Sequence, residues 1–310
     1  MKQIPDIQFL LYDNIDRKLW DECVISSPNS LIYARSFYLD NICPGWCALA
    51  GNNYEWVTPV TNRRKWGISY LYQPPFTQQL GIFARPNIDP PVEEILNWLK
   101  KRFKFWEINW NYATNTDALV PPVQVTVATN FVLDLSKGYE SIAANYKIDL
   151  IKNIKKARSL NLIYRSTDDY KKCIQLFKQY YHNRISHLQQ RDYDSFEKIC
   201  SFAAKHDMFL GREVLAADGN LMSIILLLND GKRLYNLMNI TTEIGRQAEA
   251  NRFLLDSVIR EFSGRDLLFD FEGSDLPGVK SFYKNFGGVN QSYFSLKYNA
   301  LPGLLKLFKK

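Results

Sequence analysis

The chain has 310 residues, 46% of them hydrophobic, which is enough to bury one large core or two ordinary ones. Its net charge of +7 implies a mild attraction to nucleic acid, phospholipid headgroups or phosphorylated small molecules, without selecting among them. No basic start leads into a long apolar stretch, and the strongest apolar run, Leu221–Leu228, is too short to cross a bilayer. We therefore expect a cytoplasmic protein.

The five cysteines are odd in number and irregular in spacing, so we expect reduced and mostly buried thiols. Cys43 and Cys47 are close enough in sequence to share a metal ion. However, no second pair follows, and the chain has only three histidines. The sequence therefore predicts no metal site.

Residues 1–135 are predicted to form a first α/β domain. Strands are expected at 54–60 and 67–72, and apolar residues at helical spacing follow Asp89-Pro90-Pro91. From Trp106 to Tyr112, apolar and polar residues alternate, as in a strand with one buried face. Basic and aromatic residues in this region would also suit stacking on nucleic acid bases, but the periodicity accounts for the aromatics as core.

Residues 136–298 are predicted to form a second domain, and the tail at 299–310 is expected to return to the first. The order of its elements follows from apolar periodicity, capping residues and turn signals. Two hairpin signals, Asp218-Gly219 and Asp230-Gly231, join three antiparallel strands. The expected elements are a strand at 160–165, a helix after Thr167, a helix around Phe196, strands at 208–217, 221–229 and 232–239, a helix at 248–262, a strand at 266–272, a helix at 277–286 and a strand at 291–298.

The helix at 277–286 carries a recognisable motif. Its residues Phe282-Tyr283-Lys284-Asn285-Phe286-Gly287 resemble the aromatic-Tyr-x-x-x-Gly ending of GNAT superfamily acyltransferases, whose tyrosine protonates the departing thiolate. The element order of the second domain is also that of the GNAT fold. The predicted fold class is therefore mixed α/β, with two GNAT-like domains (acyl-CoA N-acyltransferase fold) in tandem, and Tyr283 is the candidate acid.

A broader match, from Phe131 to the C-terminus, resembles the Fem family of peptidyltransferases, which are built from two GNAT-like domains. The Fem ending is Phe-Lys-x-x-Phe-Gly, so Tyr283 stands in place of the lysine that is thought to act at the acyl carbonyl. Lys284 lies one residue later, and such a shift turns a helical side chain by about 100°. Lys284 is therefore a candidate site residue that cannot simply replace the lysine, whereas Tyr283 could also donate a hydrogen bond to an oxyanion.

Further candidates follow from the same resemblance. Leu133-Asp134-Leu135-Ser136 followed by 152–157 resembles the start of the Fem catalytic domain, where a basic helix lies near anionic substrate. That implies substrate contacts for Lys152, Lys155 and Lys156, although a basic face can equally be just solvated. The run Tyr72–Gly81 resembles a loop in the first domain of Fem-like proteins.

The strand at 266–272 presents two carboxylates, Asp270 and Glu272, at one edge of the sheet. Either they hold the amine of an acyl acceptor, or they form a solvated edge or a lysine pair. Asn239, where the third antiparallel strand ends, completes the substrate-binding candidates together with Arg246.

The nature of the acyl donor depends on Arg246–Asn251, which stands where coenzyme A-dependent GNAT enzymes have a Gly-rich phosphate loop. Arg246 fits the first position, but Glu249 replaces one glycine, and Asn251 replaces a glycine or alanine. A carboxylate about 4 Å from a phosphate costs on the order of 1–4 kcal/mol near a surface. Acetyl-coenzyme A is therefore the less favoured donor. Fem enzymes, which take an aminoacyl group from charged transfer RNA, also lack that loop.

These observations predict an N-acyltransferase with no tightly bound cofactor. It would form an amide on an amine-bearing acceptor, as in aminoacyl transfer from charged tRNA to a cell-envelope (peptidoglycan) precursor. Two alternatives stay open: a non-catalytic GNAT-fold module that binds RNA or an anionic glycolipid, and an acetyl-CoA-dependent N-acetyltransferase. No Gly-x-Ser-x-Gly, Gly-rich phosphate loop or His-Glu-x-x-His motif supports a hydrolase or nucleotide-hydrolysing enzyme.

The tail at 299–310 interleaves leucines with lysines. It would either touch an anionic inner membrane surface peripherally or pack its leucines on the first domain. The sequence gives no oligomeric state.

Overall fold

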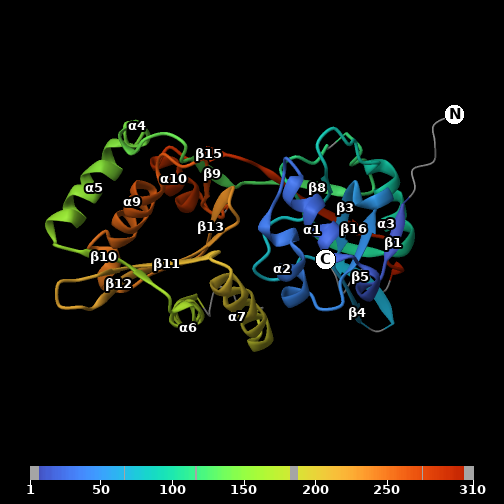
Figure 1. The fold of residues 1–310 in the computed structure, drawn as a ribbon, viewed down its shortest axis with the longest axis horizontal. Coiled ribbons are helices and arrows are strands. Elements are labelled where there is room, and N and C mark those ends of the chain that lie inside the picture. Colours follow the sequence, from blue (N-terminus) through green and yellow to red (C-terminus); the bar gives the residue numbers. More distant parts are fainter. Residues whose placement is uncertain (1–6, 66, 116, 182–187, 274, 304–310) are drawn as a thin grey trace. The chain divides into compact units, whose positions relative to one another are not determined.

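The computed structural model describes residues 7–65, 67–115, 117–181, 188–273 and 275–303. Two compact units make up the chain (Figure 1). The first unit combines Met1–Ala128 with Ser292–Lys310, and the second unit is Thr129–Gln291. Each has its own hydrophobic core.

The first unit contains two sheets and three α-helices among its described residues. One sheet has the strand order β1-β2-β3-β6 and the other β4-β5-β7-β16-β8. The helices are α1 (Arg17–Ser26), α2 (Ser36–Ile42) and α3 (Val92–Arg102). The strands are β1 (Gln8–Leu10), β2 (Cys47–Ala50), β3 (Trp56–Val60), β4 (Asn62–Lys65), β5 (Ile68–Tyr72), β6 (Phe83–Ala84), β7 (Phe105–Trp110), β8 (Gln124–Ala128) and β16 (Tyr293–Asn299).

Helix α3 shows how local sequence sets an element of the first unit. It begins after Pro91 and buries Ile95, Leu96 and Leu99 on one face. Acidic residues occupy its first turn and basic residues its last, which suits the helix dipole. The helix lies where the sequence pattern predicts it.

Strand β16 corrects the predicted domain boundaries. It pairs antiparallel with β7 and β8, so it belongs to the five-stranded sheet of the first unit. Leu296 and Tyr298 fill the core of that unit, which explains why the strand docks there. The sequence pattern predicts this strand, as 291–298, in the second domain, and that assignment is wrong. Conversely, β9 (Phe131–Asp134) pairs within the second unit, which begins before the predicted position 136.

The second unit has one seven-stranded sheet with the order β10-β11-β12-β13-β14-β9-β15. Its strands pair antiparallel except for β13 and β14, which are parallel. The strands are β10 (Ile163–Thr167), β11 (Phe209–Leu215), β12 (Leu221–Asn229), β13 (Arg233–Thr241), β14 (Leu268–Asp270) and β15 (Val289–Asn290), besides β9. The helices are α4 (Tyr139–Ala143), α5 (Ile148–Ser159), α6 (Tyr170–Tyr181), α7 (Gln190–Lys205), α8 (Glu243–Gln247), α9 (Ala250–Phe262) and α10 (Pro277–Asn285).

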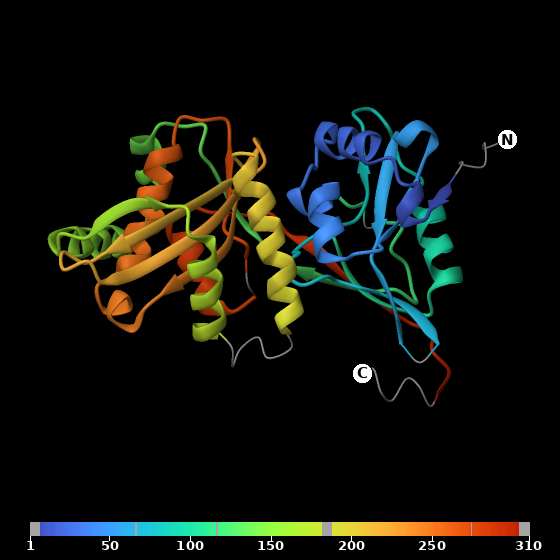
Figure 2. The same ribbon diagram turned by 60° about the horizontal axis from the view of Figure 1, so that its bottom comes forward.

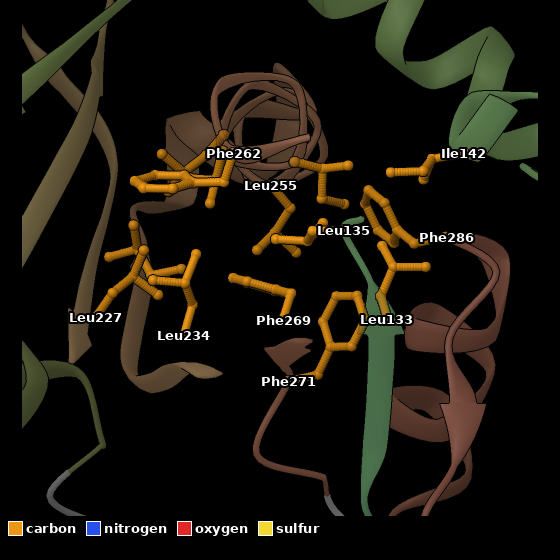
Figure 3. Packing of buried hydrophobic residues seen from close by; sticks show 14 of the residues in the cluster. Leu133, Leu135, Ile142, Leu227, Leu234, Leu255, Phe262, Phe269, Phe271 and Phe286 are labelled. Atoms are coloured by element: carbon orange, nitrogen blue, oxygen red, sulfur yellow. The ribbon is translucent and has the colours of Figure 1, made fainter. Parts of the chain in front are cut away.

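Helices cover both faces of this sheet. Helix α9 packs on β11, β12 and β13 with α5 beside it, while α6 and α7 cover the opposite face (Figure 2). The core between α9 and the sheet is aromatic and aliphatic (Figure 3). In it Leu255 and Phe262 of α9 face Leu227, Leu234 and Phe269 of the strands. This core fixes the strands that carry the candidate site.

Three details of the second unit differ from the sequence-based expectation. The edge strand is shifted to Ile163–Thr167, since it pairs with β11 over that range. Strand β14 is only three residues long and ends before Glu272. The short helix α8 precedes α9 and was not expected.

The cysteines and the tail complete the description. All five cysteines are free and buried. Within the described ranges, no helix is long and apolar enough to cross a membrane. Residues 304–310, which carry most of the amphipathic tail pattern, lie outside the described residues.

Candidate functional site

The parallel strands β13 and β14 of the second unit separate after a short stretch of pairing. They pair only from Arg233 to Tyr235 on β13, after which β13 continues to Thr241 while β14 ends at Asp270. A β-bulge in the pairing of β12 with β13 lies at the same level. The first residue past the pairing, Asn236, is buried, and its Oδ1 has no hydrogen-bond partner among the described residues. Bulges and unsatisfied buried groups often mark functional sites.

Glu272 follows β14 directly and has an unusual environment. Its φ of 55° lies in the left-handed region. The turn is held because Asp270 Oδ1 accepts the Glu272 N–H at 3.0 Å and Asn130 Oδ1 accepts the Gly273 N–H at 2.8 Å. Although the residue as a whole is half-buried, its Oε1 is buried with no hydrogen-bond partner in the part of the chain that is described. Burial raises the pKa of Glu272 to about 8.

Tyr283 of α10 lies within electrostatic reach of this carboxyl group. Its ring stacks on Phe271, with the ring centroids 4.7 Å apart and the planes at 28°. Burial raises the pKa of the Tyr283 phenol well above its usual value, and the negative charge of Glu272 raises it further. At neutral pH the phenol therefore holds its proton, and it sits within electrostatic reach of Glu272.

Asp270 and Lys284, the other two catalytic candidates, have different surroundings. Asp270 is 1% exposed and forms an ion pair with Arg233 at 2.5 Å, while Arg233 also donates to Gln291 Oε1 at 3.0 Å. Its carboxylate is thus already engaged by a cation and by the Glu272 N–H. Lys284 is exposed, with Nζ 6.0 Å from the ring centroid of Phe131. The structure brings Glu272 and Tyr283 together but gives Asp270 an internal partner.

A cavity of about 550 Å³ lies in the second unit beyond the separated strands. Five elements (α6, β13, α8, α9 and α10) and the loop before α9 line it. Aromatic walls come from α6 and α10, and cationic groups come from α8 and α9. The lining residues include Tyr181, Arg246, Glu249, Asn251, Arg252 and Phe282. Phe282 connects this cavity to the pair just described, since it lines the cavity and its ring centroid lies 5.7 Å from that of Tyr283.

The substrate-binding candidates are distributed unevenly about this cavity. Arg246 lines it and donates to Thr241 O at 3.1 Å. Asn239 lies on β13, and its backbone oxygen accepts the Tyr181 hydroxyl at 3.1 Å. Lys152, Lys155 and Lys156 are exposed on α5, and Lys156 Nζ donates to Gln247 O at 3.1 Å. The lysines therefore form a surface of their own rather than a wall of the cavity.

The sequence does not predict that one wall of the cavity is aromatic and cationic. This wall is formed by Tyr180, Tyr181, Arg252 and Phe282. The guanidinium of Arg252 lies over the Phe282 ring at 5.3 Å, which is a cation–π contact. A tyrosine pair at the end of an amphipathic helix was the available signal for two of these residues. Among the described residues, no cluster of three or more His, Cys, Asp or Glu could hold a metal ion.

The second unit has the element order and the separating parallel strands of the GNAT fold, and the chain as a whole has the tandem form of that fold. The sequence matches no protein-family model and no curated protein. The fold is shared with solved structures, among them the crystal structure of FemX, with a TM-score of 0.67 at 13% identity, covering 98% of this chain and 100% of that chain.

Two further structures resemble the chain over nearly its full length. L-PGS from Bacillus licheniformis has a TM-score of 0.55 at 9% identity, covering 94% of each chain. A tandem GNAT protein from the clavulanic acid biosynthesis pathway has a TM-score of 0.54 at 10% identity, covering 96% of this chain and 100% of that chain. At such identities the likeness establishes the fold. The predicted fold class, two GNAT-like domains in tandem, is confirmed.

Proposed function

We propose that the second unit transfers an acyl group to an amine and forms an amide. The reaction takes place in the opening between β13 and β14, which is where the two strands separate beyond Tyr235 and Asp270. Glu272 acts as the general base and Tyr283 as the general acid. The observation that carries this proposal is the buried Glu272 Oε1, which has no partner among the described residues and lies within electrostatic reach of the Tyr283 phenol. An acyltransferase fold supports it.

The chemistry requires two proton transfers, and the two groups suit them. The acceptor amine attacks the acyl carbonyl carbon, a C–N bond forms, and Glu272 takes the proton that the nitrogen loses. As the bond from the acyl carbon to the carrier oxygen or sulfur breaks, Tyr283 donates its proton to that atom. A base works best with a pKa near the working pH, and the value of about 8 for Glu272 meets this condition. The raised pKa of Tyr283 keeps its proton available for donation.

Within this class we propose an aminoacyl or related acyl group as the cargo and a cell-envelope precursor as the acceptor. The support is the resemblance of the C-terminal half to Fem peptidyltransferases and the shared fold with FemX and L-PGS. The donor would be charged tRNA, and Glu249 in the cavity wall disfavours coenzyme A. Asp270 then acts by fixing the turn that carries Glu272 rather than by holding the acceptor.

The exposed face of α5 favours a second candidate function, a non-catalytic module that binds RNA or an anionic glycolipid. Lys152 and Lys155 point outward beside Ile148, which is 71% exposed. Neither lysine has an ion-pair partner in the described part of the chain. Such a surface attracts anionic polymers without any catalysis.

One experiment separates these candidates. Labelled aminoacyl-tRNA and acetyl-coenzyme A are offered side by side, each with amine acceptors that include peptidoglycan-precursor peptides. Amide formation from aminoacyl-tRNA is the expected result. Turnover of acetyl-coenzyme A would contradict the donor assignment. Tight RNA binding without turnover of either donor, together with loss of binding in Lys152→Ala/Lys155→Ala, would contradict catalysis and favour the module.

A further inference from the structure

The loop between α8 and α9 has the backbone of an anion-binding turn but carries a carboxylate. Glu249 adopts φ 57° and ψ 25°, a left-handed conformation that favours glycine. It is the N-cap of α9, a helix of 13 residues, and its backbone oxygen accepts the N–H groups of Arg252 and Phe253. The chain therefore keeps, at a glutamate, a conformation in which glycine is the usual residue.

Several positive groups surround this turn. The backbone N–H groups of Ala250 and Asn251, in the first turn of α9, have no hydrogen-bond acceptor among the residues that the structure describes. Free first-turn donors of this kind carry the positive end of the helix dipole. Arg246 and Arg252 line the same cavity, and Arg246 donates from Nη1 to Thr241 O. Two guanidinium groups and a helix N-terminus form a favourable environment for a phosphate.

The carboxylate of Glu249 stands inside this positive environment. It lines the cavity, is 17% exposed and forms an ion pair with Arg252 three residues later. The ion pair engages the guanidinium group of Arg252, one of the two cations. It also holds the Glu249 carboxylate in place near the free N–H groups. An incoming phosphate would have to displace the carboxylate or tolerate its repulsion in a half-buried place, where charges are screened less than in bulk water.

We infer that Glu249 is the specificity-determining residue that excludes diphosphate-bearing donors, such as coenzyme A, from this cavity. The ion pair with Arg252 holds the carboxylate in place, so exclusion is a property of the folded loop. The inference rests on the proposed function insofar as the cavity is the donor side of the site. The test below measures binding, so its outcome does not depend on catalysis.

The test compares three single variants by calorimetric titration with coenzyme A. Glu249→Gly removes the charge and suits the backbone, and Glu249→Gln removes the charge but keeps the size. Glu243→Gln is the matched control, because Glu243 is exposed on α8, outside the cavity wall, and the net charge changes equally. Removing the repulsion predicts binding at least tenfold tighter in Glu249→Gly, a smaller gain in Glu249→Gln and none in Glu243→Gln. Adding Arg252→Ala to Glu249→Gly should remove most of the gain.

Three results would overturn the inference. The first is a folded Glu249→Gly, checked by circular dichroism, that binds coenzyme A no tighter than the wild type. The second is an equal gain in Glu243→Gln. The third, should the glycine variant not fold, is a Glu249→Gln protein with unchanged affinity. Aminoacyl transfer is assayed separately, and its absence would contradict the proposed function while leaving the binding result intact.

Discussion

The two units share a feature of the GNAT fold but use it differently. Each contains a parallel strand pair, β5 with β7 in the first unit and β13 with β14 in the second. In the second unit the strands separate beyond the pairing. In the first unit the chain after β5 fills the corresponding place: Asn109 on β7 donates to Gln73 Oε1 at 2.8 Å, and Leu80 forms a parallel bridge with Trp110. Backbone hydrogen bonds of 2.9 Å join Leu80 to Asn109 and to Asn111.

This difference is the reason why the proposed site lies in the second unit. In the first unit, backbone groups of β7 and the residue after it bond to the Gln73 side chain and to the backbone of Leu80. In the second unit Asn236 and Glu272 keep buried oxygens without a partner among the described residues. The segment Tyr72–Gly81 resembles a loop of Fem-like first domains. Its residues Gln73 and Leu80 bond to β7 just beyond the β5–β7 pairing.

The largest effect is expected for the buried ion pair at the end of the parallel pairing. Asp270→Ala leaves Arg233 buried without its carboxylate and should destabilise the second unit by about 3–5 kcal/mol. Glu107, at the equivalent end of pairing in the first unit, forms a 3.0 Å ion pair with Lys297 whose side chains are 51% and 36% exposed. Glu107→Ala should therefore lower stability by less than about 1 kcal/mol.

Urea unfolding can be followed unit by unit, since all seven tryptophans lie within residues 1–128. Tryptophan fluorescence reports on the first unit, and far-UV circular dichroism reports on both. Equal losses of stability in Asp270→Ala and Glu107→Ala would contradict the distinction between the two pairs.

The next effect concerns catalysis. Glu272→Gln keeps the size of the side chain but cannot accept a proton, so the transfer rate should fall at least about 100-fold, as for loss of a general base. Glu107 lies at the end of the β5–β7 pairing in the first unit, so Glu107→Gln should keep the wild-type rate. Single-turnover transfer from labelled donor measures both. A similar loss in the two variants would break the assignment of catalysis to the second unit.

A smaller effect is expected at Tyr283. Tyr283→Phe keeps the ring that stacks on Phe271 and removes only the hydroxyl, so the rate should fall about tenfold or more while the melting temperature changes little. Lys284→Ala, one residue along the helix and exposed, should leave the rate near that of the wild type. The same transfer assay compares the two variants. A greater loss of rate in Lys284→Ala than in Tyr283→Phe would assign the role of the acid to Lys284 instead.

The last effect is a dependence of stability on pH. The pKa of Glu272 is raised from 4.5 in the unfolded chain to about 8 in the folded one. Between these values the folded state retains a proton that the unfolded state has lost, so this contribution is present below about pH 4.5 and is lost as the pH rises through 8. Glu272→Gln lacks it. The melting temperature of the variant relative to that of the wild type should therefore rise steadily between pH 5 and pH 8; a constant difference would contradict a buried, uncompensated carboxyl group.

Much of the fold was predictable because its signals are local. The turns at Asp218-Gly219 and Asp230-Gly231 set the hairpins of β11, β12 and β13, and apolar spacing set α9. The partner of β16 was not predictable: alternation at Leu296 and Tyr298 shows that one face is buried but not which sheet buries it.

The candidate site was predictable only in part. The motif around Tyr283 and the acidic pair Asp270 and Glu272 follow from the sequence. Their different environments do not, because Arg233, which engages Asp270, lies 37 residues away and meets it only through the sheet. The left-handed backbone of Glu272 could not be predicted either, because glycine and asparagine are the residues that favour such a conformation.

The most direct test of the account is the titration of the Glu272 carboxyl group itself. Carbon-13 NMR of protein labelled at the glutamate side-chain carboxyl, assigned by comparison with Glu272→Gln, follows its protonation without any substrate. The structure predicts a midpoint near pH 8 for this one resonance. A midpoint near the ordinary glutamate value of 4.5 would contradict the claim that the opening in the second unit holds a buried base.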